Sequence, residues 1–270
     1  MSFWIGHNLK ERLIDKNLDF KAWLIPTKFK IMEFHSAADF TVKKIADINE
    51  NIFVSYSGGV DSEYALLSFY RNKIPITPIL IQTTGNKSEL SYAYYMCKKL
   101  NIQPIVINIS HEEYKLLYKY CLNKLHAYGL WTLPNILASR VAKNKNGILV
   151  TGNEMVDYNF DNVWNVMCAE YDFYHEVLLP ENQHADFFTH TPEIAYSLIY
   201  QYDGSPVDQL KHRVYQTDYR PKLSPVHSER FHEQINKMRD EVTNKFPNQI
   251  HNFGHRDQFI KIMESWNDQL

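Results

Sequence analysis

A short apolar run leads directly into a turn rich in serine and glycine: Ile52-Phe53-Val54-Ser55-Tyr56-Ser57-Gly58-Gly59-Val60-Asp61-Ser62. The apolar run predicts a buried strand, and a helix is predicted from Ser62 to Arg71. Two glycines between these elements let the backbone approach an anion and direct successive N–H groups at it, and the helix N-terminus adds partial positive charge. The pattern therefore predicts a phosphate-binding loop.

Asp61 stands inside this predicted anion site, where a bound phosphate would repel its carboxylate. Its presence is explained if it holds a Mg²⁺ ion that bridges the phosphates. The alternative is an ordinary Gly-Gly turn in which Asp61 and Ser62 only cap the following helix. The segment matches neither the GxxxxGK[ST] loop nor the GxGxxG dinucleotide fingerprint, so a different type of phosphate loop is indicated.

Apolar strands and helices alternate after this loop. Strands are predicted at 77–82, 104–109 and 147–150, and helices at 87–100, 111–126 and 133–142. Strands this apolar, separated by helices, favour an α/β fold with an open parallel sheet and helices on both faces.

The flanking regions lack this regular alternation. Residues 8–17 and 36–48 predict helices, the second with Ser36 as its N-cap, and 192–202, 228–245 and 256–266 predict helices in the second half, with Thr191 capping the first of these. We expect three parts: an N-terminal extension at 1–50 packed on the core, an α/β core at 51–157, and a mostly helical lobe at 158–270 that acts as substrate lobe or cap.

The bulk composition limits the function. The formal net charge of -2 gives no general electrostatic reason for nucleic-acid binding, although it leaves a local basic patch open. Three cysteines without a CxxC pair argue against a disulfide framework and favour a reducing, cytoplasmic location. Because no apolar run approaches the ~18 residues that span a bilayer, we expect a soluble protein with no membrane association.

The segment Ser57-Gly58-Gly59-Val60-Asp61-Ser62 resembles the SGGxDS signature of the PP-loop family, the N-type ATP pyrophosphatases. The resemblance covers roughly residues 50–157 and implies that this core is an ATP-binding domain with the fold of the adenine nucleotide α-hydrolases. It implies an enzyme in which the loop, together with Ser55, binds the pyrophosphate end of ATP. It also implies that Mg²⁺ assists while a substrate oxygen attacks the α-phosphate, giving an adenylate and free pyrophosphate.

Two further strand ends agree with this resemblance. Gln82-Thr83-Thr84 stands where the second strand of the family contacts adenine or ribose, and Gly152-Asn153-Glu154 resembles the second ATP-side motif. Asp157, four residues beyond Asn153, is a second candidate Mg²⁺ ligand beside Asp61. Either strand end can instead be an ordinary turn.

Other residues indicate which branch of the PP-loop family the sequence resembles. Paired cysteines common in tRNA-thiolating members are missing, whereas Val150–Asp157 and Arg220-Pro221-Lys222 loosely resemble the synthetase domain of asparagine synthetases. The basic residues Arg213, Arg220 and Lys222 cluster near prolines, and we expect Arg220 and Lys222 to stabilise the departing pyrophosphate. A solvated surface turn is the alternative reading.

A second group of residues, two histidines and an aspartate, could suggest a metal site. His184, Asp186 and His190 match no zinc spacing, and a polar loop is the favoured interpretation.

Together these patterns predict an AMP- and pyrophosphate-forming ligase that uses ATP and Mg²⁺ to adenylate a carboxylate or carbonyl oxygen before attack by a nitrogen nucleophile. The substrate would be a small molecule or a nucleobase. Ser2 stands where a glutaminase needs cysteine, so ammonia or an amine would come from a separate source. Two alternatives remain open: a PP-loop enzyme that modifies a nucleobase or tRNA by amidation or sulfur transfer, and a non-catalytic ATP-binding sensor module.

Overall fold

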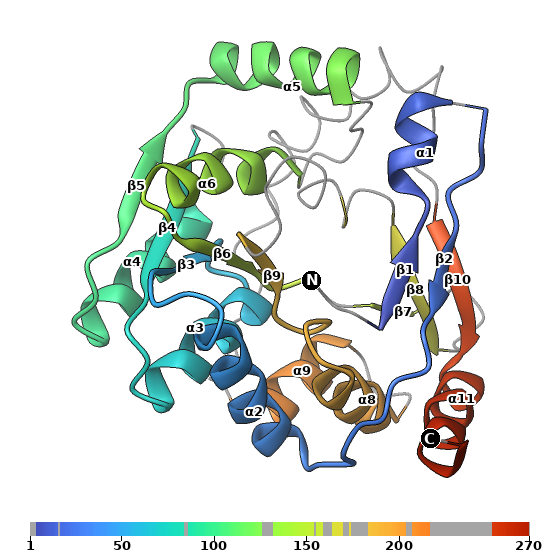
Figure 1. Cartoon of the computed structure of the whole chain (residues 1–270). Helices are drawn as coiled ribbons and strands as arrows, with labels where there is room; N and C mark the ends of the chain where they lie inside the picture. The colour runs from blue at the N-terminus through green and yellow to red at the C-terminus, as the bar shows by residue number, and fades with distance from the viewer. Residues whose placement is uncertain are drawn as a thin grey trace.

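The computed structural model describes residues 4–15, 17–83, 86–125, 132–153, 155–158, 164–169, 173, 183–203, 207–216 and 250–269. Its largest sheet has five strands, all parallel, in the order β5-β4-β3-β6-β9 (Figure 1). These strands are β3 (Ile52–Ser55), β4 (Thr77–Gln82), β5 (Ile105–Asn108), β6 (Ile148–Thr151) and β9 (His184–Asp186).

Successive residues of the central strands are buried on opposite faces of this sheet. Val54 of β3 packs in one hydrophobic core and its neighbour Phe53 in the other. Ile148 and Leu149 of β6 divide between the two cores in the same way. Because side chains alternate along a strand, burial of both sets requires cover on both faces. The predicted α/β class with an open parallel sheet is therefore confirmed.

Helices form that cover. One face packs against α2 (Phe34–Ala46), α3 (Val60–Arg71), α4 (Lys87–Lys99), α8 (Pro192–Gln201) and α9 (Val207–Tyr215). The other packs against α5 (His111–Leu125) and α6 (Thr132–Asn144). For most of these helices, the ends predicted from the sequence lie within two residues of the ends in the structure.

The N-terminal region joins a second, antiparallel part of the structure (Figure 1). It consists of β1 (Ile5–His7), α1 (Leu9–Ile14) and β2 (Ala22–Leu24), whose two strands pair with each other. A three-stranded sheet in the order β10-β8-β7 contains β7 (Val156–Tyr158), β8 (Trp164–Ala169) and β10 (Ile250–His255), which leads into α11 (Arg256–Gln269). Trp4 joins these regions: its indole N–H donates to the Thr189 carbonyl at 2.9 Å, and its ring lies 6.4 Å from that of Phe259.

The division into 1–50, 51–157 and 158–270 stays a prediction. The fifth strand of the main sheet, β9, comes from beyond residue 157, so the C-terminal segment contributes to the sheet itself. The helix predicted at 228–245 lies outside the described residues.

The two predicted helix caps have different outcomes. Thr191 is confirmed, because its hydroxyl oxygen accepts a hydrogen bond from the backbone N–H of Ile194 at 3.4 Å. Ser36 is wrong as a cap: the helix begins two residues earlier, at Phe34, and the Glu33 carboxylate accepts from the Ser36 N–H. Burial of Phe34 in the core explains the earlier start, because it fixes the first turn against α3.

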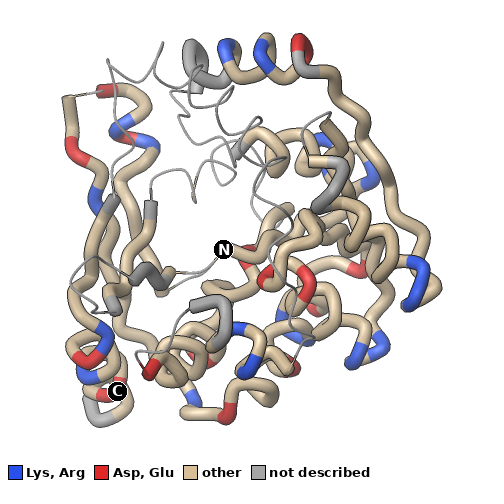
Figure 2. The backbone as a smooth tube through the Cα atoms, turned by 180° about the vertical axis from the view of Figure 1, so that it is seen from behind, with Lys and Arg blue, Asp and Glu red and all other residues tan. Residues whose placement is uncertain are grey.

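Charge is spread over the described surface. Figure 2 shows acidic and basic residues interspersed along the chain, which agrees with the net charge of -2. None of the helices in the described ranges combines the length and apolarity needed to cross a membrane.

Candidate functional site

The strand order creates one point at which the chain changes direction across the sheet. From β3 the chain moves outward through β4 and β5, and it then returns to add β6 and β9 on the other side of β3. In open α/β sheets, ligands bind beyond the carboxyl ends of the strands at such a point. Here it lies between β3 and β6, so the loop that begins at Ser57 and the turn at Gly152 face the same crevice.

The Ser57–Ser62 loop turns back over the start of α3. Gly58 has φ +85°, in the left-handed region that favours glycine. The Gly59 N–H donates to Ser57 Oγ at 3.2 Å, and the Ser62 hydroxyl donates to the Gly59 carbonyl at 3.0 Å. The Ser57 and Ser62 hydroxyl oxygens lie 3.1 Å apart, so both hydroxyls gather at one point above the helix.

Helix α3 begins at this loop without a side-chain cap, because its N-cap residue is Gly59. A glycine N-cap leaves the N–H groups of the first turn, which starts at Val60, without a side-chain acceptor from that position. The twelve-residue helix also directs the positive end of its dipole toward the loop. The arrangement suits an anion such as a phosphate group.

Gly152 holds the turn after β6 against this loop. A Cβ atom on Gly152 would lie 3.2 Å from both the backbone N and the Cα of Ser62, and 3.3 Å from the carbonyl carbon of Asp61. These distances are shorter than ordinary van der Waals contact, so glycine permits the close approach. Gly152 and Asn153, two of the residues predicted to bind nucleotide, are thus at the predicted loop.

A buried hydrogen-bonded group beneath that turn positions it. Asp186 Oδ2 accepts from the Thr151 hydroxyl at 2.8 Å and from the Asn153 N–H at 3.1 Å. Thr151 has one hydroxyl proton, which it gives to Asp186, so the 3.1 Å contact between its oxygen and His184 Nε2 requires the imidazole to donate. The polar-loop interpretation of His184 and Asp186 was wrong, because both lie in the parallel strand β9.

Asp61, the predicted Mg²⁺ ligand, is engaged by α9. Lys211 Nζ donates to Asp61 Oδ2 at 2.9 Å, and the Tyr215 hydroxyl donates to Oδ1 at 2.9 Å. The Lys211 side chain is 11% exposed and that of Asp61 is 25% exposed, so the ion pair is largely withdrawn from water. Sequence reasoning missed both partners. Their spacing of four residues places them on one helix face, but nothing in the sequence indicated which element that face would meet.

Stacked aromatic rings seat α9 against α3. The Tyr215 ring lies 4.5 Å from that of Tyr64 at an interplanar angle of 22°. Phe34 and Phe188 stack on the same pair, with ring centroids 5.8 and 5.7 Å from that of Tyr215. Burial raises the pKa of Tyr64 to about 12, although the Arg71 guanidinium opposes the shift. This stack places the end of α9 beside the first turn of α3.

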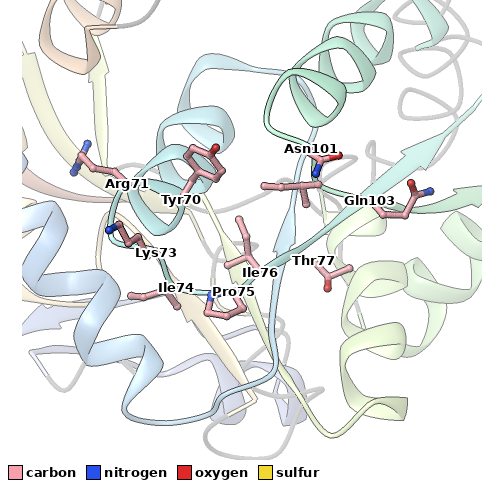
Figure 3. Close-up of a pocket in the computed structure, with 10 residues that line it drawn as sticks. Tyr70, Arg71, Lys73, Ile74, Pro75, Ile76, Thr77, Asn101 and Gln103 are labelled. Atoms are coloured by element: carbon pink, nitrogen blue, oxygen red, sulfur yellow. The ribbon is translucent and has the colours of Figure 1, made fainter.

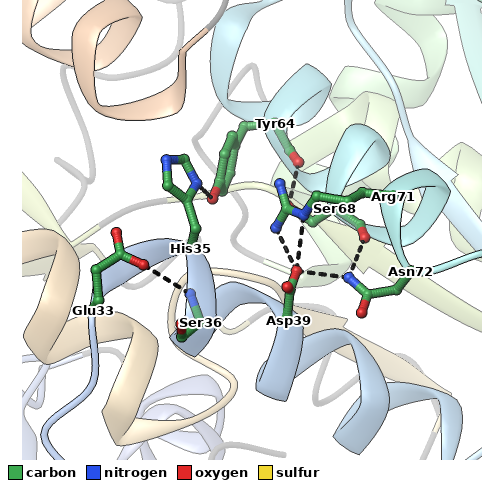
Figure 4. Close-up of polar contacts among 8 residues, drawn as sticks. All are labelled: Glu33, His35, Ser36, Asp39, Tyr64, Ser68, Arg71 and Asn72. Carbon is green, nitrogen blue, oxygen red and sulfur yellow. Dashed lines mark hydrogen bonds and ion pairs between the residues drawn. The ribbon is translucent and has the colours of Figure 1, made fainter.

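A polar network on the outer side of that stack ties α2 to α3 (Figure 4). The Arg71 guanidinium donates through Nε to Asp39 Oδ1 at 2.9 Å, and the Asn72 amide donates to the same oxygen at 2.7 Å. His35 Nδ1 lies 2.8 Å from the Tyr64 hydroxyl. The network therefore joins α2 to α3, the helix that follows the Ser57–Ser62 loop.

The predicted base-binding strand end lies beside the loop, because β4 neighbours β3 in the sheet. Gln82 Oε1 accepts from the Tyr94 hydroxyl at 2.9 Å, and the Thr83 N–H donates to Asn86 Oδ1 at 2.8 Å. Ser55, at the end of β3, donates its hydroxyl to Asn135 Oδ1 of α6 at 2.8 Å. These polar groups line the carboxyl ends of neighbouring strands.

The remaining predicted residues divide into two groups. Arg220, Lys222, Glu154 and Thr84 lie outside the described residues. Asp157 belongs to β7, where its backbone pairs with Asn165. Arg213 donates to Asp203 at 2.8 Å, and both side chains are more than half exposed, which is typical of a surface pair.

A groove of about 790 Å³ lies elsewhere, at the opposite edge of the sheet (Figure 3). Its lining includes Thr77, the first residue of β4, and Arg71, the last residue of α3. Helix α3 runs from the Ser57–Ser62 loop to this groove, a length of ~18 Å at 1.5 Å per residue. The groove is therefore separate from the site at the carboxyl edge.

Within the described ranges, no group of three or more His, Cys, Asp or Glu side chains is placed to hold a metal ion. A metal at Asp61 would consequently need oxygen ligands from phosphate and water. Mg²⁺ commonly binds in that way, through one or two carboxylates together with substrate phosphates and several waters. The Asp61 carboxylate could supply one ligand to such an ion, and its two oxygens now accept from Lys211 and Tyr215.

Comparisons with known proteins found similar chains among solved structures. No protein-family model matches the sequence, and no curated protein matches it significantly. Among solved structures, the chain is similar to an NMN synthetase from Francisella tularensis, with 14% identity, a TM-score of 0.40, and coverage of 80% of this chain and 97% of that one. It is also similar to a predicted subunit of tRNA methyltransferase from Methanocaldococcus jannaschii, with 15% identity, a TM-score of 0.40, and coverage of 76% and 97%.

A third similar structure is the NH3-dependent NAD synthetase of Campylobacter jejuni, with 16% identity, a TM-score of 0.39, and coverage of 80% of this chain and 98% of that one. At these identities and scores the likeness identifies neither a reaction nor a substrate. The resemblance to the PP-loop family rests on the SGGxDS loop and on the open parallel sheet, and the chain has both.

Proposed function

We propose that this chain is an ATP-dependent ligase that forms AMP and pyrophosphate by adenylating a carboxylate or carbonyl oxygen before a nitrogen nucleophile attacks. The observation that carries the proposal is the position of the SGGxDS loop: it joins the carboxyl end of β3 to the uncapped start of α3, beside the point where the strand order reverses. A glycine-rich turn that was merely structural would not require that position.

The loop would hold the β- and γ-phosphates of ATP. Gly58 and Gly59 let phosphate oxygens approach the backbone, and the first-turn N–H groups of α3 donate to them. The Ser57 and Ser62 hydroxyls, now 3.1 Å apart, can rotate from their internal bonds toward bound oxygens. The adenosine would extend along the strand ends toward Gln82 and Thr83, on the neighbouring strand.

The chemistry requires positioning and charge stabilisation more than a protein nucleophile. A substrate oxygen held in line with the α-phosphorus attacks, and pyrophosphate leaves. The turn at Gly152–Asn153, fixed by Asp186, would border the α-phosphate. Mg²⁺, held by Asp61 and the phosphates, would supply positive charge as negative charge builds on the leaving group.

The products of ATP cleavage test this proposal. Purified protein is incubated with ATP labelled with ³²P at either the α- or the γ-phosphate, Mg²⁺, ammonium and pools of carboxylic acids, and all labelled products are resolved. We expect AMP and pyrophosphate in equal amounts, whereas release of ADP and phosphate would refute the assignment. Asp61→Asn should abolish turnover, and Asp257→Asn, at a carboxylate that is 77% exposed on α11, should leave it unchanged.

The same assay separates the alternatives. Cleavage that depends on added tRNA or a free nucleobase would favour the modification enzyme over the carboxylate ligase. Tight ATP binding without cleavage in every pool would favour the sensor module. The proposed setting is cytoplasmic, with ammonia or an amine from a separate source.

A further inference from the structure

Both carboxylate oxygens of Asp61 already have donors from a helix that is distant in sequence. Lys211 Nζ bonds to Oδ2 and the Tyr215 hydroxyl to Oδ1, each at 2.9 Å. The proposed function requires the same carboxylate to bind a divalent cation. The ammonium of Lys211 is therefore already bonded to a carboxylate oxygen that the metal would need as a ligand.

The two cations compete for this ligand. A carboxylate oxygen has a second lone pair, but a divalent ion bound there would lie within a few ångströms of the ammonium. With the Lys211 side chain 11% exposed and that of Asp61 25% exposed, little water is present to screen the repulsion. A metal that binds Asp61 would consequently displace the ammonium of Lys211.

An ammonium of Lys211 that leaves Asp61 would lose the negative charge it now faces at 2.9 Å. Loss of a counter-charge in a largely buried position is unfavourable, so a new negative charge nearby would attract the ammonium. Phosphates bound at Ser57–Ser62 would be the nearest new negative charge, because Asp61 belongs to that loop. The four-carbon stem of lysine lets its ammonium change partner without movement of the backbone.

Helix α9 can stay in place during such a change. The Tyr215 ring is stacked 4.5 Å from Tyr64 and is flanked by Phe34 and Phe188. These contacts anchor the helix by its aromatic residue and are independent of the Lys211 ammonium. Only the lysine side chain has to move.

We propose that Lys211 is a movable counter-ion of this site. It neutralises Asp61 while the loop is empty, and it transfers to bound phosphate when a divalent cation takes Asp61. The binding of a divalent cation at Asp61 and the identity of the phosphate ligand both rest on the proposed function, whereas the contacts of Asp61 with Lys211 and Tyr215 do not. The exchange couples metal and phosphate binding: each ligand should bind more tightly in the presence of the other, and by the same factor.

Mn²⁺ binding without nucleotide tests the competition. Free Mn²⁺ is measured by electron paramagnetic resonance during titration of wild-type protein and of Lys211→Met, which keeps the unbranched chain to within one atom and removes its charge. We expect the variant to bind Mn²⁺ about tenfold more tightly, within the usual range of coupling between sites. Tyr215→Phe should give a smaller increase, since it removes one donor to Asp61 and retains the ring.

Three controls limit the interpretation. Lys115→Met removes a lysine from an exposed ion pair with Glu112 on α5 and should leave Mn²⁺ affinity unchanged. Lys211→Arg keeps the positive charge and should show no tightening. Asp61→Asn combined with Lys211→Met should lose the gain, which would assign it to the Asp61 carboxylate.

Pyrophosphate binding tests the transfer. Inorganic pyrophosphate with Mn²⁺ should bind the wild type at least tenfold more tightly than it binds Lys211→Met, as expected for loss of a charged phosphate contact. Equal Mn²⁺ affinity in the wild type and a folded Lys211→Met would overturn the proposal. If that variant does not fold, Lys211→Gln is measured in its place, and equal Mn²⁺ affinity in the wild type and in Lys211→Gln overturns the proposal. ATP cleavage plays no part in these readouts, so failure of the ligase assignment would be seen separately.

Discussion

The Cα of Gly152 faces the backbone of Ser62 so closely that a methyl group on Gly152 would lie 3.2 Å from the Ser62 nitrogen. This contact joins the ends of β6 and β3 and sets the width of the crevice between them. It connects the turn that follows Thr151 to the first turn of α3.

Gly152→Ala should therefore weaken nucleotide binding without unfolding the protein. The added methyl group has to push the loop or the helix start by a few tenths of an ångström, which would disturb the N–H groups proposed to bind phosphate. We expect a loss of about tenfold in affinity for ATP or pyrophosphate, comparable to loss of one charge-assisted hydrogen bond. Calorimetric titration measures it, and the thermal midpoint reports folding. Unchanged affinity would show that the turn does not border the phosphates.

Thr151→Val tests the group that positions this turn. The substitution keeps the shape of the side chain and removes the hydroxyl that donates to Asp186 at 2.8 Å. A hydrogen bond to a charged group contributes about 2 kcal/mol, so the free energy of unfolding should fall by that order. Thr189→Val is the matched control, because its hydroxyl lies 3.4 Å from the other Asp186 oxygen. Equal losses in urea denaturation of both variants would contradict the assigned role.

Because His190 is buried with a lowered pKa, we expect the free energy of unfolding to depend on pH. Burial lowers the pKa of His190 to about 3, from an ordinary value of 6.5. Between these values the unfolded chain binds a proton that the folded chain does not, so stability falls as pH decreases through this window. The slope from this one group approaches about 1.4 kcal/mol per pH unit.

Urea denaturation of wild type and His190→Gln from pH 7.5 to 4.5 measures this slope. The variant should lose less stability on acidification, and groups common to both proteins cancel in the difference. Parallel curves would show that His190 is accessible to protons in the folded state.

The catalytic role of Lys222, which lies outside the described residues, stays a prediction. A cation held near Pro221 and Pro225 would gain strength as charge builds on the departing pyrophosphate, and its loss should lower turnover about 10²-fold with little change in ATP affinity. Single-turnover release of pyrophosphate from Lys222→Ala, measured beside ATP binding, tests this. Unchanged release would place Lys222 on the solvated surface and leave Lys211 as the cation of the C-terminal segment.

The sequence by itself determined the elements and the loop. Strand β3, helix α3 and the phosphate turn between them were predicted because glycine conformation, helix polarity and apolar runs act over a few neighbouring residues. The parallel class of the sheet followed from the same local signals, since fully apolar strands separated by helices require cover on both faces.

Only the tertiary structure decided which distant residues meet at the site. His184 and Asp186 read as a polar loop, yet they form the edge strand that holds the turn after β6. No sequence pattern around Lys211 and Tyr215 indicates a function, and their partner Asp61 is 150 or more residues away in the chain. Contacts of this kind depend on how whole helices pack, here on the stacking of Tyr215 against Tyr64, which no pattern of neighbouring residues encodes.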